Sequence, residues 1–129
     1  MPQKITVIIL LPCLLMLMLA IAGGSADATQ PKLHQVIYIT VSKACGCTMD
    51  RCQAGDRVVE RAFAGDKRVL VKRIDYSTDK ETALIYIKKY RLIMPPSLIF
   101  LDAQGNLLWR AEGEMDYKAV VAKLKELEG

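Results

Sequence analysis

Residues 36–52 read VIYITVSKACGCTMDRC and join an apolar, β-branched run to a cluster of three cysteines. The nearly continuous run Val36 to Val41 predicts a strand that is covered on both faces of its sheet. The segment Thr48 to Ala64 predicts a helix, because its apolar residues recur on one face. Within it, Gly55 indicates a kink or break, after which Asp56 is able to cap a new turn. The cysteines therefore stand at a strand-to-helix junction, where backbone N–H groups and the helix dipole stabilise a thiolate.

The rest of the chain continues to alternate between strand and helix. Val69 to Ile74 predicts a second strand, and Thr78-Asp79-Lys80-Glu81 is typical of the capping box that begins a helix. Met94-Pro95-Pro96 stops that helical stretch. The last predicted elements are a strand, a turn, a hairpin partner and a capped helix, over Ser97 to Leu101, Asp102 to Asn106, Leu107 to Ala111 and the segment after Asp116. The order βαβαββα predicts an α/β fold with a four-stranded mixed sheet and helices on both faces.

The N-terminal part of the chain has the pattern of an export signal. Lys4 precedes an uncharged apolar run from Ile5 to Ala22, and small residues then lead to Ala26-Asp27-Ala28. We interpret residues 1–28 as a signal peptide or a retained membrane anchor, 29–34 as a linker and 35–129 as the domain. A lipoprotein with its lipid on Cys13 is a third interpretation. All three place the domain outside the cytoplasm, in the periplasm or another extracytoplasmic space.

The composition and charge of the sequence exclude some classes of binding partner and cofactor. The formal net charge of the 129 residues is +4, but basic and acidic residues are interspersed throughout the part of the chain that follows the apolar N-terminal segment. The sequence has no basic stripe for nucleic acid, and we expect contact with a membrane only through the N-terminal segment. No glycine-rich phosphate loop, paired-carboxylate site or Ser-His-Asp set is apparent, and we expect no cofactor. The domain has three cysteines, so one pair can close and leave a free thiol, or all three can serve a metal.

The element order, with cysteines after the first strand and a proline before the third, resembles the thioredoxin superfamily. The resemblance covers Gln35 to Leu127. Val71 to Asp75 is similar to the family's second core strand, which ends in Asp. Arg91 to Phe100 is similar to the segment that carries the family's cis-proline, which implies a cis peptide bond between Met94 and Pro95. The resemblance implies a thioredoxin-like fold and thiol–disulfide oxidoreductase activity on protein thiols or disulfides.

The cysteine cluster departs from the family's usual C-x-x-C motif. The chain has Cys45-Gly46-Cys47, followed by four residues and then Cys52. Ala44 stands where the family usually has an aromatic residue. The acid that the family often buries in its first strand is absent from Gln35 to Val41.

The redox interpretation assigns Cys45, Cys47, Cys52 and Pro95 to the catalytic site. Cys45 is expected to attack first, as the outermost thiol at the helix start, with Lys43 adding positive charge nearby. Cys47 is close enough in sequence to resolve a mixed disulfide, although the ring that it closes is small and strained. Pairing Cys52 with Cys47 requires the first helical turn to unwind or tilt. A cis-proline at Pro95 is expected to leave the preceding backbone free to pair with an extended substrate.

Two other interpretations use the same residues. Cys45, Cys47 and Cys52 can supply three thiolates, and Met49 a fourth soft donor, to copper(I) or zinc. His34 precedes the first strand, so the resemblance places it at the opposite end of the domain from the cysteines. The third interpretation is a thioredoxin-fold binding module without turnover.

Overall fold

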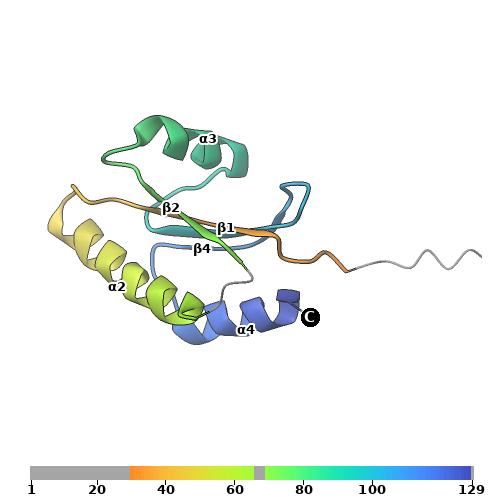
Figure 1. Cartoon of the computed structure of the whole chain (residues 1–129). Helices are drawn as coiled ribbons and strands as arrows, with labels where there is room; N and C mark the ends of the chain where they lie inside the picture. The colour runs from red at the N-terminus through yellow and green to blue at the C-terminus, as the bar shows by residue number, and fades with distance from the viewer. Residues whose placement is uncertain (1–29, 66–68, 129) are drawn as a thin grey trace, which may run out of the picture.

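The computed structural model describes residues 30–65 and 69–128, and within them four strands and three helices (Figure 1). The strands are β1 (Gln35–Thr40), β2 (Val71–Asp75), β3 (Ser97–Leu101) and β4 (Leu107–Glu112). The helices are α2 (Gly46–Phe63), α3 (Lys80–Tyr90) and α4 (Tyr117–Glu128). The order βαβαββα predicted from the sequence is confirmed.

The sheet has the strand order β2-β1-β3-β4. The strand β1 pairs with β2 in parallel and with β3 in antiparallel orientation, and β4 is added antiparallel to β3 as a hairpin. A parallel pair needs a crossover connection, which α2 supplies between β1 and β2. The predicted four-stranded mixed sheet is therefore confirmed, with the two most apolar strands at its centre.

Helices cover both faces of this sheet. Figure 1 shows α3 on one face and α2 and α4 together on the other. On the α2–α4 face, Val59, Val120 and Leu124 pack with Tyr38 and Phe100. On the α3 face, a second cluster buries Ile37, Ile39, Ile74, Ala83, Tyr90, Ile99 and Leu101. Because both faces are covered, β1 and β3 lack the polar alternation of a half-exposed strand.

The helix α2 runs through Gly55 without a break, so the predicted kink is wrong. A Cβ atom at Gly55 would lie 2.8 Å from Pro96 Cγ and 2.8 Å from the Tyr38 hydroxyl. Glycine is needed here because the helix approaches the sheet and the segment before β3 this closely. Asp56 does not cap a new turn either, since its carboxylate binds side chains of the sheet.

The ends of the elements show which polar residues terminate them. Asp79, rather than the predicted Thr78, is the N-cap of α3, and its side chain accepts a hydrogen bond from the Thr82 amide at 3.2 Å. Asp116 accepts hydrogen bonds from the first amides of α4, as expected. Leu33, before β1, is buried in the core of the α2–α4 face, and its N–H donates to the Leu127 carbonyl.

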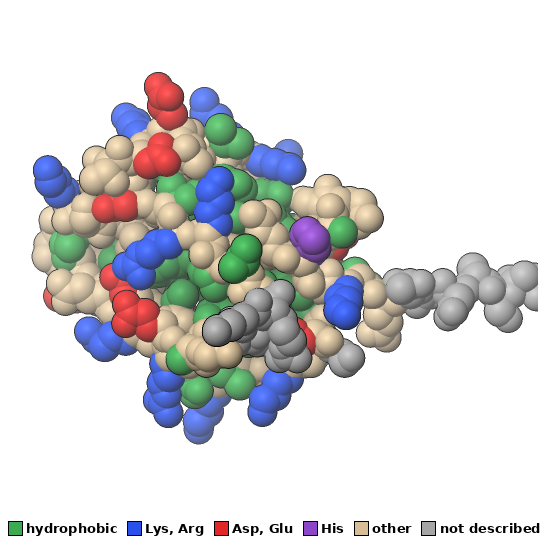
Figure 2. Space-filling model, viewed as in Figure 1, with side chains coloured by type: hydrophobic (Ala, Val, Ile, Leu, Met, Phe, Trp, Pro, Cys, Tyr) green, Lys and Arg blue, Asp and Glu red, His purple; other side chains and the backbone are tan. Residues whose placement is uncertain are grey.

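The expected signal peptide or anchor, and Cys13 with it, lies outside the described residues. Within residues 30–65 and 69–128, none of the helices is both long and apolar enough to cross a membrane. Figure 2 shows Lys and Arg side chains distributed among acidic and neutral ones on the face in view, without a continuous basic stripe.

Candidate functional site

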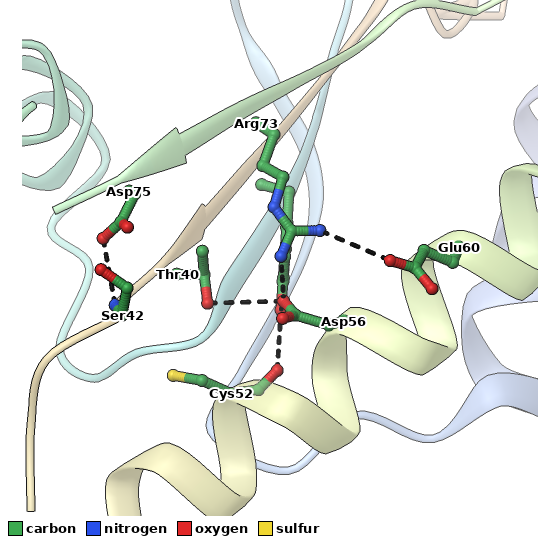
Figure 3. Close-up of polar contacts among 8 residues, drawn as sticks. Thr40, Ser42, Cys52, Asp56, Glu60, Arg73 and Asp75 are labelled. Carbon is green, nitrogen blue, oxygen red and sulfur yellow. Dashed lines mark hydrogen bonds and ion pairs between the residues drawn. The ribbon is translucent and has the colours of Figure 1, made fainter. Parts of the chain in front are cut away.

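The loop that leads from β1 to the cysteines is fixed by hydrogen bonds to the end of β2. The Ser42 amide donates to Asp75 Oδ1 and to Ser77 Oγ, both at 3.1 Å, and the Lys43 amide donates to Ser77 Oγ at 3.0 Å. Figure 3 shows the contact between Ser42 and Asp75. Partial burial opposes ionisation of Asp75, but hydrogen bonds from Ser42 and Ser77 outweigh it and lower its pKa. The carboxylate at the end of β2 therefore holds the segment that precedes Cys45.

Cys45 is the N-cap residue of α2, and its thiol is exposed. Its sulfur lies 3.3 Å from Thr48 Oγ1 and 3.3 Å from the sulfur of Cys47. Hydrogen bonds from the Thr48 side chain, the Thr48 backbone amide and the Cys47 thiol lower the pKa of Cys45 to about 7. The sequence suggested a lowered pKa but attributed it in part to Lys43. The structure shows Thr48 in that role, on the first turn of the same helix.

The three cysteines do not converge on one point. Cys45 and Cys47 are exposed at the start of α2, whereas Cys52 is 1% exposed and sits further along the helix in its buried part. Among the described residues, no group of three or more His, Cys, Asp or Glu side chains is placed to hold a metal ion. The three thiols therefore do not form one ligand set in the described part of the chain, because Cys45 and Cys47 are exposed and Cys52 is buried. His34 is exposed ahead of β1, at the strand end opposite the cysteines.

The cis peptide bond joins Pro95 to Pro96, so the prediction of a cis Met94–Pro95 bond is wrong by one residue. Both bonds precede a proline, and either sequence position tolerates the cis form. Packing distinguishes them, since Pro96 is fully buried and its ring lies where Gly55 has no side chain. Pro95 instead lines a pocket beside the cysteines.

That pocket has a volume of about 370 Å³ and lies between α3, the end of β1 and the segment before β3. Its lining includes Ala44, which precedes Cys45, and Thr48, whose hydroxyl contacts the Cys45 sulfur. Most of the remaining lining is apolar, and Ile93 and Met94 in it are 79% and 42% exposed. The exposed thiol of Cys45 therefore lies beside an apolar pocket that Pro95 helps to line.

A part-buried polar cluster between α2 and the sheet was not recognised in the sequence (Figure 3). Asp56 Oδ1 accepts a hydrogen bond from the Tyr38 hydroxyl at 2.8 Å and forms an ion pair with Arg73 at 2.7 Å. The Tyr38 hydroxyl also lies 3.3 Å from the Cys52 carbonyl oxygen. Burial and the neighbouring carboxylate of Asp56 raise the pKa of Tyr38. A tyrosine in a buried strand was the available signal, because its hydroxyl needs a partner.

Solved structures place this architecture among known folds, whereas no protein-family model and no curated protein matches the chain. Mitochondrial thioredoxin 3 from Saccharomyces cerevisiae superposes with a TM-score of 0.55 at 17% identity, over 74% of this chain and 80% of that one. Thioredoxin O2 from Arabidopsis thaliana superposes with a TM-score of 0.54 at 18% identity, over 76% and 77%. The chain has a thioredoxin-like fold. Trxlp from Edwardsiella tarda agrees, with a TM-score of 0.53 at 18% identity, over 71% of this chain and 82% of that one.

The thioredoxin-like fold determines which elements surround the cysteine cluster. The cluster follows the central strand β1 and opens α2, and Pro96 with its cis bond stands directly before β3. The predicted fold class is thus confirmed at the level of the whole domain. The spacing Cys45-Gly46-Cys47 is a feature of this chain's own sequence.

Proposed function

We propose that this protein is an exported thiol–disulfide oxidoreductase in which Cys45 is the attacking thiol and Cys47 the resolving thiol. The observation that carries the proposal is the Cys45 sulfur, exposed at the start of α2, with its pKa lowered to about 7 and the Cys47 sulfur 3.3 Å away. Near neutral pH about half of such a thiol is thiolate, which is the reactive form. The partners are protein thiols or disulfides.

The reaction consists of two exchange steps. The Cys45 thiolate attacks one sulfur of the partner's disulfide, so that a Cys45–partner bond forms, the partner's S–S bond breaks, and the leaving thiolate takes up a proton. The Cys47 thiol then loses its proton and attacks the Cys45 sulfur, which releases the partner's second thiolate for protonation. The partner gains two electrons and two protons, and Cys45 and Cys47 become a disulfide. The reverse sequence oxidises a partner dithiol.

Cys52 has a packing role in this proposal, although the sequence assigned it to the site. It is 1% exposed, and its backbone carbonyl lies against the Tyr38 hydroxyl within the core. A partner sulfur cannot approach a thiol at this depth in line with an S–S bond while α2 keeps its place. We therefore expect Cys52→Ser to retain exchange activity.

Three cysteine variants test the assignment, with the rate of insulin disulfide reduction by the dithiothreitol-recycled protein as the readout. Cys45→Ser is expected to abolish turnover, and Cys47→Ser to accumulate a mixed disulfide between Cys45 and the partner, visible by mass spectrometry. Cys52→Ser is the matched control. Turnover that survives Cys45→Ser overturns the assignment. A wild-type protein that catalyses no exchange, although Cys45 is alkylated readily, overturns the oxidoreductase proposal and favours a binding module.

Export is the second part of the proposal and rests on the sequence pattern of residues 1–28. Outside the cytoplasm an oxidising environment favours the disulfide form of the Cys45–Cys47 pair. Mass spectrometry of the native protein, with and without alkylation, is expected to show a chain that lacks these residues or that stays membrane-attached through them. A full-length chain recovered from the cytoplasm contradicts export without bearing on the exchange chemistry.

A further inference from the structure

The segment before β3 has no backbone N–H group left to offer a partner. The amides of Ile93 and Met94 both donate to Glu112 Oε2, at 2.6 and 3.2 Å. Pro95 and Pro96 have no N–H group. Four consecutive residues beside the thiols therefore lack a free donor, which differs from the expectation that this backbone is free to pair with an extended substrate.

Glu112 is well placed to keep these two amides occupied. Its side chain is only 14% exposed, and its other carboxylate oxygen lies 3.5 Å from Arg110 Nε. Hydrogen bonds from amides to a carboxylate are among the stronger ones in proteins. An arriving peptide carbonyl is a neutral acceptor, so it is a poor competitor for the same N–H groups.

Pairing between extended chains needs donors and acceptors on both sides. With carbonyl groups alone, this segment can form at most half of the backbone hydrogen bonds that pair two extended chains. Side chains must therefore supply most of the recognition beside Cys45.

The side chains available for recognition are apolar. Ile93 and Met94 are exposed at the pocket of about 370 Å³, whose lining also includes Leu84 and Ile87 from α3. Among the described residues that line the pocket, Lys43 alone is charged. The pocket thus suits an uncharged apolar side chain, and Lys43 disfavours a basic one.

We propose that the protein selects its partner cysteines by the side chain next to them, which is a large apolar group that enters this pocket while the partner's main chain stays unpaired. The inference rests on the proposed exchange at Cys45, because Ala44 and Thr48 place the pocket directly beside that thiol. The expected partner is a disulfide-bonded segment with a Leu-like or aromatic residue adjacent to its cysteine.

Exchange kinetics with short synthetic peptides test this selection. Each peptide carries one cysteine as a mixed disulfide with thionitrobenzoate, and the adjacent residue is Leu, Ser or Lys. Burying a Leu-sized side chain predicts a kcat/KM about tenfold higher for the Leu peptide than for the Ser peptide, with the Lys peptide slowest. An ester analogue of the Leu peptide, with a weaker carbonyl acceptor, is expected to react within about twofold of the amide, since the segment has no donor to lose.

Ile93→Ser is the matching protein variant, because Ile93 is 79% exposed and its replacement leaves the core intact. It is expected to remove most of the difference in kcat/KM between the Leu and Ser peptides. Ile85→Ser is the control, since Ile85 is 63% exposed on α3 and does not line the pocket. Equal rates for the Leu and Ser peptides, or a tenfold loss with the ester, overturn the selection proposal. Failure of every disulfide to react with Cys45 instead overturns the proposed function.

Discussion

The hydroxyl oxygen of Thr48 lies 3.3 Å from the sulfur of Cys45, one helical turn away at the start of α2. This hydroxyl is the largest contribution to the lowered pKa of Cys45, followed by the Thr48 backbone amide. Reactivity at the site is therefore governed by a neutral hydrogen-bond donor of the same helix.

The pH dependence of Cys45 alkylation follows from this arrangement. Because only the thiolate reacts, the rate with iodoacetamide is expected to rise tenfold per pH unit below about 7 and to level off above it. Mass spectrometry of the alkylated peptides assigns the rate to Cys45. A rate that still rises steeply between pH 8 and pH 9 contradicts the lowered pKa.

Replacement of Thr48 by Val removes the hydroxyl and keeps the size of the side chain. The pKa of Cys45 is expected to move towards the ordinary thiol value of roughly 8.5. Alkylation at pH 7 then slows by about five- to tenfold, as measured by the same assay. Thr48→Ser retains the hydroxyl and serves as the control. If Thr48→Ser and Thr48→Val shift the profile equally, the hydroxyl is not the cause.

Gly55→Ala tests the close approach of α2 to the sheet. The added methyl group would lie 2.8 Å from both Pro96 Cγ and the Tyr38 hydroxyl, so we expect a loss of about 1–3 kcal/mol in the free energy of unfolding. Urea denaturation of the reduced protein measures it. Gly46→Ala is the matched control, because a Cβ there meets nothing within 4 Å. A loss of similar size in both variants shows that helix position, and not contact, determines the result.

The hydrogen bond between Tyr38 and Asp56 is expected to contribute to stability. Asp56→Ala removes the shorter hydrogen bond of the buried Tyr38 hydroxyl, which keeps the longer contact to the Cys52 carbonyl, and should lower the free energy of unfolding by about 1–3 kcal/mol. A double-mutant cycle with Tyr38→Phe isolates the pair, and a coupling energy of at least about 0.5 kcal/mol is expected. Strictly additive losses indicate that the other contacts of Asp56, with Arg73 and Thr40, account for its role.

Asp75 gives the domain a predictable response to acid. Its pKa is lowered in the folded state, so its contribution to stability is complete above the unfolded value of about 3.9 and is lost as the pH falls through the folded value. Asp75→Asn should therefore be less stable than the wild type at pH 7, by less than about 1 kcal/mol, and the difference should shrink below about pH 4. Urea titrations at pH 7 and pH 3 measure it. A difference that is constant between these pH values contradicts the assigned role.

The fold was predictable from local pattern, because β1 and β3 are apolar at nearly every position and the helices carry clear boundaries. Asp116 caps α4 as its sequence context indicates. The errors lie where a residue's role depends on a distant partner. Gly55 has the signature of a helix break, and only the approach of Pro96 and Tyr38 shows why glycine is there.

The place of the candidate site in the fold was predictable, but its geometry was not. The sequence located Cys45 and Cys47 at the start of a helix, where the structure has them. It did not show that Cys52 is buried, that Thr48 contacts the thiol, or that the cis bond precedes Pro96. The first two depend on the direction in which a side chain points from a helix, and the third on the conformation of the backbone before β3. All three are determined by packing against the sheet, which the local sequence does not show.

The seating of the Pro96 ring against Gly55 links the helix that carries the thiols to the segment that carries Pro95. Both halves of the site are thereby fixed to one core, and a shift of either requires the other to follow. The site is therefore preorganised, and this protein loses little conformational entropy when a partner binds. The partner loses most of the conformational entropy on binding. Flexible or locally unfolded substrates should therefore show a larger unfavourable entropy of binding than rigid ones.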